Sequence, residues 1–193
     1  MHPRFEELSA HLDRQRAELR AAVDSIPSPY HAMPPADDQW SVLGVLEHLV
    51  IVEGRIAKLI QKNLDDARAG GLQTETDDTP LLPLLNIASF TDRTRRIKAS
   101  DAAQPKLGRE LDELWQSLDA SLGTFHQLLA SADGMRLGTV TMPHPIFGPL
   151  DLYTWFAFVG SHEARHAAQI REIGVMLTGS TTAREPAQPD AKA

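Results

Sequence analysis

Two histidines near the carboxyl end of the chain have the spacing of a metal-chelating pair. His162 and His166 are four residues apart in a segment with helical periodicity. That separation places both imidazoles on one face of a helix, about one turn apart. At about 100° per residue, this face also carries Trp155, Val159 and Ile173, so both rings are expected to point into the protein. The pair therefore predicts a chelating site inside a helical fold.

A third histidine, His48, lies in an earlier helical segment beside Val45 and Val52, near the edge of the apolar stripe. Three neutral imidazoles around one divalent ion, with a position left for water or substrate, are typical of catalytic zinc sites. Without a shared ligand, each buried imidazole would carry an unpaired polar group that costs about 1–3 kcal/mol. We predict His48, His162 and His166 as ligands of one ion, zinc or nickel, although imidazole also suits copper and iron.

The alternatives are two unrelated buried histidines bonded to carbonyl groups, or a pair at the protein surface. The other five histidines lie at a terminus, in a loop or at the flank of a helical stripe, where each has an ordinary interpretation: His2, His11, His31, His126 and His144. There is no cysteine, which excludes disulfides, thiolate metal sites, zinc fingers and a cysteine nucleophile. Histidine and carboxylate remain as ligands.

The segment from His162 to His166 also matches H-E-x-x-H, the zinc metalloprotease pattern in which the glutamate is a general base. Such proteases usually take a third ligand downstream, but no histidine follows His166. The later carboxylates are Glu172, Glu185 and Asp190. Two of these lie in the tail, and no strand is evident that would hold a peptide by β-pairing. The protease interpretation is therefore the weaker one.

Residues beside the ligands have candidate roles of their own. Glu163 is a candidate catalytic base or a partner of the ligands, and the alternative is a carboxylate on the helix surface. Arg165 and Gln169 flank the same edge and could orient a substrate, or could be solvated or salt-bridged at the surface.

Four segments with helical periodicity must position these side chains. They cover about residues 5–26, 41–69, 109–132 and 151–177. Ser41 and Asp151 are candidate N-caps, and glycines or prolines end the segments. Four amphipathic helices with one stripe each are best buried around a shared core, which predicts an all-α four-helix bundle with long crossover connections.

The connections are expected to differ in kind. Residues 70–108 combine an apolar patch at 81–90 with a basic cluster that could form a short helix: Arg93, Arg95, Arg96 and Lys98. Residues 134–149 contain three prolines and suit a short extended piece but not a central strand. We expect one domain over residues 1–177 and a mobile tail over 178–193, rich in Thr, Ala and Pro.

Composition and charge limit the possible partners. With 193 residues, 42% hydrophobic and 23% charged, the chain has the composition of an ordinary globular domain. A net charge of −7 without a long basic run argues against nucleic acid as a partner. No apolar stretch suits a signal peptide or a membrane span, so a cytoplasmic location is expected. The apolar residues at 81–90 and 155–158 make a homodimer plausible, or form a cap on the bundle.

Several of these motifs also resemble those of a known family. The matching residues are Trp40-Ser41, Glu47-His48-Leu49, the run from His144 to Leu150, His162, Arg165-His166 and Gln169-Ile170. Together they resemble the signature of the DinB-like superfamily over about residues 5–177. The resemblance implies a four-helix bundle with a long crossover and a three-histidine metal site, carried onto His48, His162 and His166.

The resemblance also implies candidate activities. The superfamily includes metal-dependent thiol S-transferases that use bacillithiol or mycothiol, and a maleylpyruvate isomerase that depends on a thiol cofactor. We therefore expect a metal-dependent enzyme, of thiol S-transferase or hydrolase type, that activates a water or a low-molecular-weight thiol toward a small-molecule substrate. The competing hypothesis is a non-enzymatic, stress-associated metal-binding bundle.

Overall fold

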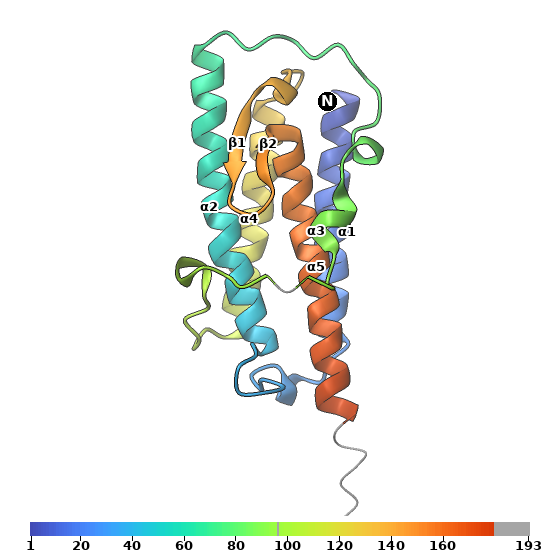
Figure 1. The fold of residues 1–193 in the computed structure, drawn as a ribbon, viewed down its shortest axis with the longest axis vertical. Coiled ribbons are helices and arrows are strands. Elements are labelled where there is room, and N and C mark those ends of the chain that lie inside the picture. Colours follow the sequence, from blue (N-terminus) through green and yellow to red (C-terminus); the bar gives the residue numbers. More distant parts are fainter. Residues whose placement is uncertain (96, 180–193) are drawn as a thin grey trace, which may run out of the picture.

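The computed structural model describes residues 1–95 and 97–179 of the chain. Four long helices run along the molecule: α1 (Pro3–Asp24), α2 (Val42–Ala69), α4 (Leu111–Ser131) and α5 (Leu152–Gly179) (Figure 1). Their bounds agree with the predicted segments to within a few residues. The predicted all-α four-helix bundle is confirmed.

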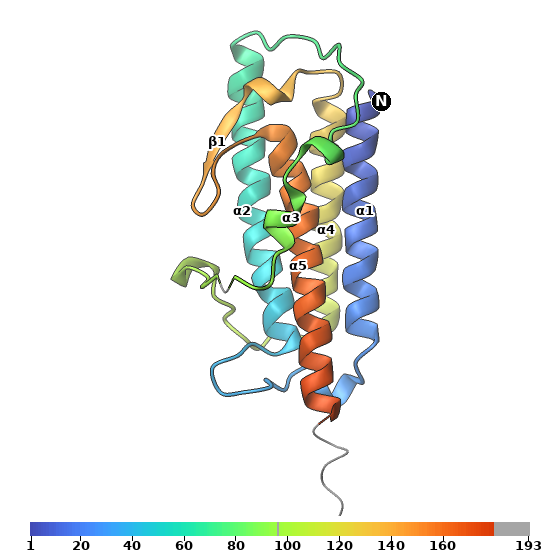
Figure 2. The same ribbon diagram turned by 45° about the vertical axis from the view of Figure 1, so that its right-hand side comes forward.

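The order of the helices requires one long crossover. α2 and α4 run in the same direction, so the chain returns along the whole bundle between them, over residues 70–110 (Figure 1). The segments that follow the two helices meet where the amide of Glu75 donates to the carbonyl of Gly134 at 2.7 Å. α1 packs along α5 and α2 packs along α4 (Figure 1), and Figure 2 shows these helices running along the long axis of the molecule. Residues that are distant in sequence therefore face one another across the core.

The core has two apolar halves with a charged layer between them. One half contains Phe5, Phe125 and Phe156, and the other contains Leu19, Leu46, Leu118 and Ile170, among other buried side chains. Between them, the three helices α1, α2 and α5 each contribute a buried charged side chain: Arg16, Glu53 and Glu163. Apolar side chains thus fill both halves of the bundle, and buried charged side chains lie between them.

Side-chain caps fix where two of the helices start. The hydroxyl of Ser41 accepts from the amide of Gly44 at 3.1 Å, and Asp151 Oδ1 accepts from the amide of Thr154 at 2.8 Å. Both satisfy donors that the first turn of a helix leaves free. Because His48 lies on the second turn of α2, the cap at Ser41 helps set the position of its ring along the bundle.

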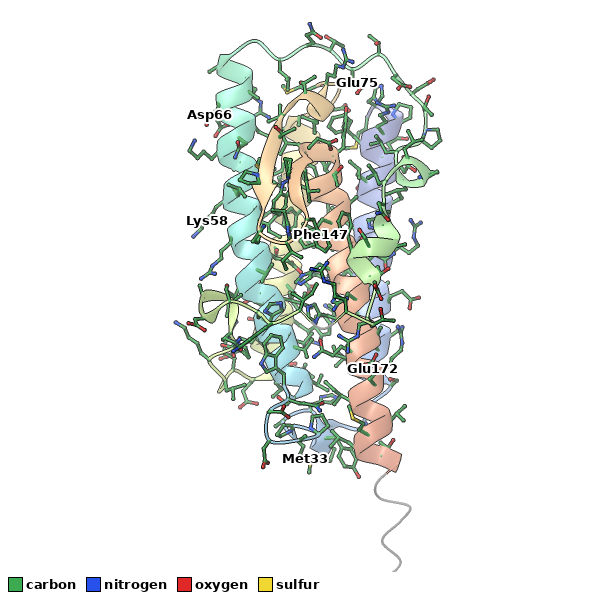
Figure 3. All side chains as sticks on the ribbon, in the orientation of Figure 1. Met33, Lys58, Asp66, Glu75, Phe147 and Glu172 are labelled. Atoms are coloured by element: carbon green, nitrogen blue, oxygen red, sulfur yellow. The ribbon has the colours of Figure 1, made fainter. Side chains whose placement is uncertain are left out.

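A two-stranded hairpin connects α4 to α5. β1 (Thr141–His144) pairs antiparallel with β2 (Gly148–Asp151), with His144 opposite Gly148. Gly148 has a positive φ of 76°, which a glycine adopts without strain. The predicted extended piece is confirmed, and it forms a separate hairpin rather than part of a larger sheet. Figure 3 shows Phe147, at its turn, over the middle of the bundle, whereas Lys58 and Asp66 project outward from α2.

The crossover contains a short helix, α3 (Ile87–Thr91), within the apolar patch. The basic residues that follow do not form the helix expected of them at positions 93–95 and 97–98. Instead, Arg93 pairs with Glu172 and the segment is held by α5. Short 3₁₀ helices complete the description: Ser28–Tyr30, Leu82–Leu84, Asp101–Ala103 and Leu137–Thr139.

The two apolar segments that suggested a dimer pack against each other. The ring of Phe90 lies 5.3 Å from that of Phe158 and 4.9 Å from that of Phe147. Their burial is therefore explained within one chain, and the homodimer stays a prediction. Of the predicted tail, residues 178–179 belong to α5 and residues 180–193 lie outside the described part. None of the helices in residues 1–95 and 97–179 combines the length and the hydropathy that a membrane span requires.

Candidate metal centre

The three predicted ligands meet between α2 and α5. One ring nitrogen from each of His48, His162 and His166 lies within 4.8 Å of the other two. The Nε2 atoms of His162 and His166 are 3.1 Å apart. Metal–nitrogen bonds of about 2.0–2.1 Å in a tetrahedral site place ligand nitrogens about 3.3 Å from one another. The group is therefore compatible with one divalent ion.

Hydrogen bonds to the other ring nitrogens orient two of the ligands. His48 Nδ1 lies 2.7 Å from the carbonyl oxygen of Ala103, and His166 Nδ1 lies 2.8 Å from Gln169 Oε1. Both partners are acceptors, so each Nδ1 carries the hydrogen and each Nε2 keeps a free lone pair. Such second partners hold a ligating imidazole in the tautomer that a metal needs.

Aromatic rings pack around the ligands. The ring of Phe158 is stacked on that of His162, with centroids 5.4 Å apart. The indole of Trp40 lies 4.8 Å from the ring of His48. These contacts restrict how far the two imidazoles can rotate, and they shield one side of each ring from water.

The surroundings favour the neutral, ligating form of all three rings. Burial lowers the pKa of His162 well below its usual range, and the neighbouring His166 and His48 lower it further. Burial also lowers the pKa of His166 to about 3 and lowers that of His48. Imidazoles that stay neutral at pH 7 need not lose a proton before they bind a cation.

Glu163 does not lie at the protein surface, which corrects one alternative drawn from the sequence. Its side chain is 1% exposed and forms a salt bridge with Arg16, whose Nη2 lies 2.7 Å from Glu163 Oε1. One residue along a helix turns the side chain by about 100°, away from the face that carries His162. Glu163 is therefore engaged by α1, and its role as a catalytic base stays an untested prediction.

Arg16 also binds Glu53, with 3.1 Å between Arg16 Nη2 and Glu53 Oε2. Burial and the charge of Glu163 raise the pKa of Glu53 well above its usual range. This buried ion cluster was not predicted from the sequence. A signal was available, because Arg16 and Glu53 interrupt the apolar stripes of their helices at stripe positions.

Arg165 is not the solvated surface residue that was one expectation. Arg165 is 7% exposed and donates to the backbone carbonyls of Asp92 and Arg95, the latter at 2.8 Å. It therefore fastens the crossover to α5 one residue before His166. Gln169 holds the ring of His166, as described above.

One of the five histidines set aside from the sequence lies close to this centre. His144, on β1, is 8% exposed, and its ring centroid is 4.6 Å from that of Phe158. Phe158 in turn stacks on His162. The sequence did not indicate this proximity, since the hairpin and α5 are brought together only by the fold.

Comparison with known proteins identifies the family. A family model described as DinB superfamily matches residues 11–170, which is most of the chain and includes all three histidines. The chain belongs to the DinB superfamily. The resemblance predicted from its motifs is thereby confirmed.

A curated relative and a solved structure extend the comparison for this DinB-superfamily protein. The uncharacterized protein YuaE of Bacillus subtilis (strain 168) is 29% identical over 147 residues, covering 72% of this chain and 80% of its own. The crystal structure of TT2238, a four-helix bundle protein, superimposes with a TM-score of 0.57 at 20% identity, covering 87% of this chain and 98% of its own. The similarity to TT2238 shows the fold alone.

Proposed function

We propose that this DinB-superfamily protein is a metal-dependent enzyme that holds one divalent ion through His48, His162 and His166. The observation that carries the proposal is the convergence of three buried ring nitrogens, two of them set in the ligating tautomer by Ala103 and Gln169. Three protein ligands leave a coordination position open, as catalytic sites do and structural sites do not. The expected ion is zinc or nickel.

The proposed reaction is attack by an activated water or small thiol on an electrophilic small molecule. A bound divalent ion would lower the pKa of a coordinated water toward about 7, or ionise a thiol. The chain's own residues would keep the imidazoles neutral, orient them and shield them with the rings of Trp40 and Phe158. Since the chain has no cysteine, the nucleophile would come from solvent or from a low-molecular-weight thiol.

The same contacts weigh against the metalloprotease alternative. In that reaction the glutamate of H-E-x-x-H must act on a metal-bound water. Here Glu163 accepts from both Nε and Nη2 of Arg16, at distances from 2.7 to 3.2 Å, inside the bundle. A carboxylate so occupied is badly placed to take a proton at the metal centre.

Metal content tests the ligand assignment. Wild-type protein purified without an affinity tag should contain close to one zinc or nickel ion per chain by mass spectrometry. His48→Ala, His162→Ala and His166→Ala should each lose most of it while the far-ultraviolet circular dichroism stays helical. His126→Ala, whose ring bonds to Ser9 and Asp13 outside the centre, is the matched control. Full metal content in all three ligand variants would refute the assignment.

Thiol consumption tests the enzymatic part. Metal-loaded protein is mixed with an electrophile and bacillithiol, mycothiol or glutathione, and the loss of free thiol is followed. The wild type should consume at least one of the thiols faster than His48→Ala does. Equal rates with all three would remove the thiol branch and leave hydrolysis of small esters or amides as the assay to run. Inactivity in both assays with full metal content would favour the non-enzymatic bundle.

A further inference from the structure

His144 occupies a position at the edge of the metal centre that the proposed ligand set does not explain. Along β1, buried and exposed side chains alternate, and Met142 and His144 are the buried ones. The ring of His144 packs against those of Trp155 and Phe158, with centroids 5.1 and 4.6 Å away. The hairpin therefore directs this imidazole toward α5, over the turn that precedes His162.

The hairpin turn fixes the tautomer of His144. Its Nδ1 accepts from the backbone amides of Ile146 and Phe147, at 3.1 and 3.3 Å. An imidazole that accepts at Nδ1 is neutral and carries its hydrogen on Nε2. Burial favours the same form, because it lowers the pKa of His144 to about 4. The ring thus presents a permanent N–H donor at neutral pH.

That donor is left without a partner in the part of the chain that the structure describes. No residue within 1–95 or 97–179 accepts a hydrogen bond from His144 Nε2. This atom is not one of the buried side-chain atoms that lack a partner, so it is open to solvent, and a small ligand that enters the site can reach it. The ring of Phe158 joins His144 to the centre, because its centroid lies 4.6 Å from that of His144 and 5.4 Å from that of His162. A ligand at the metal centre is a suitable acceptor.

We propose that His144 Nε2–H donates a hydrogen bond to an anionic oxygen or sulfur ligand held at the open coordination position of the metal. This inference rests on the proposed function and adds a substrate-binding residue to it. An anion that receives a charge-assisted hydrogen bond is held in one orientation and more tightly than the metal would hold it alone. The ligand class is a thiolate, carboxylate or other small anion, which a neutral donor accommodates without a buried counter-charge.

Two substitutions at His144 distinguish the loss of the Nε2 donor from the loss of the Nδ1 acceptor that supports the hairpin turn. His144→Asn keeps an acceptor near the position of Nδ1, so it can still bind the amides of Ile146 and Phe147, but it lacks a donor at Nε2. His144→Gln places an amide N–H near the position of Nε2. His126→Asn makes the same change at a histidine that contacts Ser9 and Asp13 instead.

The test measures anion affinity in cobalt-loaded protein. Each variant is loaded with Co²⁺, its content is measured, and azide and then 2-mercaptoethanol are titrated while the visible absorption of the cobalt is followed. All variants should hold about one cobalt per chain. The dissociation constant for both ligands should rise about tenfold in His144→Asn, the effect of one charge-assisted hydrogen bond. It should change by less than about threefold in His144→Gln and in His126→Asn.

The outcomes distinguish a failure of the metal centre from a failure of the proposed role of His144. Wild-type protein that takes up no cobalt would overturn the metal centre and the role of His144 together. Full cobalt uptake with the same anion affinity in wild type and His144→Asn would overturn the role of His144 alone. An equal loss in His144→Asn and His144→Gln would also overturn it, because the hairpin rather than the donor would then be responsible.

Discussion

Arg16 holds two buried carboxylates in the middle of the bundle. Its guanidinium lies 2.7 Å from Glu163 Oε1 and 3.1 Å from Glu53 Oε2, and the three side chains are between 1% and 5% exposed. Removing one partner of a buried ion cluster leaves the others without a counter-charge and is strongly destabilising. Substitutions of Arg16 and of Glu53 are therefore expected to have unequal effects on the free energy of unfolding.

Removing the cation should be the more damaging change. Arg16→Met leaves the buried carboxylate of Glu163 without its counter-charge and removes a donor from Glu53, and it should lower the free energy of unfolding by about 3–5 kcal/mol. Glu53→Gln should change it by no more than about 1 kcal/mol, because the raised pKa of Glu53 means that its charged form is already disfavoured. Urea unfolding at pH 7 measures both. A Glu53→Gln variant as unstable as Arg16→Met would contradict this account.

Gln169 is expected to act on the metal through His166. Gln169→Ala removes the acceptor that orients the ring and should weaken metal binding by about 10–100-fold. Gln169→Glu keeps an acceptor at the same reach and should bind at least as tightly as the wild type. Competition with a chromophoric chelator gives the affinities. Equal affinity in the alanine variant and the wild type would mean that His166 needs no such support.

Between helices α1 and α5, a close approach occurs where Gly160 faces His11. A Cβ atom at Gly160 would lie 2.7 Å from both Cδ2 and Nε2 of His11, closer than side chains tolerate. His11 has little freedom to move, since it is 4% exposed and its Nε2 bonds to the carbonyl of Ala157 at 3.1 Å. The contact between the two helices thus depends on the absence of a side chain at one position.

Alanine should therefore have opposite effects at two helical glycines. Gly160→Ala gains helix propensity but overpacks the interface, with a net loss of about 1–2 kcal/mol. Gly54→Ala, in α2 with nothing within 4 Å of its added Cβ, should gain about 0.5–1 kcal/mol. The melting temperatures of the metal-free variants measure both effects: Gly160→Ala should melt below the wild type and Gly54→Ala above it. Stabilisation by both substitutions would show that His11 moves aside without cost.

For the molecule as a whole, the metal is expected to be linked to folding. A ligand that binds only the folded state at about 100 times its dissociation constant adds about 2.7 kcal/mol. In a protein of this size that amount raises the melting temperature by about 5–10 °C. Zinc or nickel should produce this shift in protein treated with chelator and then dialysed, and none in His162→Ala. A shift that persists in His162→Ala would place the stabilising ion elsewhere.

The metal-free molecule should lose stability in mild acid. Burial lowers the pKa of His11 and of the metal-centre histidines, and that of His144 to about 4, whereas the unfolded chain titrates near 6.5. The unfolded state thus binds more protons than the folded state below about pH 6.5. The contribution of these histidines to the free energy of unfolding is therefore fully present above that pH and decreases toward pH 4. Each such group contributes up to about 1.4 kcal/mol per pH unit.

The midpoints of urea unfolding at pH 7 and pH 5 test whether stability decreases as the pH falls. The midpoint of the metal-free protein should be lower at pH 5. Glu53 works in the opposite direction, because its raised pKa lets the folded state keep a proton. Several histidines oppose one carboxyl group, so the net change should follow the histidines. A higher midpoint at pH 5 would show that the carboxyl cluster dominates instead.

The sequence alone determined the helices and the identity of the three clustered histidines. Apolar periodicity defined the four long segments, and the spacing of His162 and His166 fixed their shared face whatever surrounds them. Local signals sufficed because a helix repeats every 3.6 residues and its caps are formed by neighbouring residues. The match of residues 11–170 to the DinB superfamily agrees with the same motifs.

Tertiary structure decided what those helices place opposite one another. Periodicity specifies the buried face of a helix but not its axial position against a partner, which comes from side-chain packing across the whole interface. For that reason the sequence did not reveal that Glu163 binds Arg16, that Ala103 orients His48, or that His144 reaches the edge of the centre. These contacts join residues 14 to 147 positions apart, where no local rule applies.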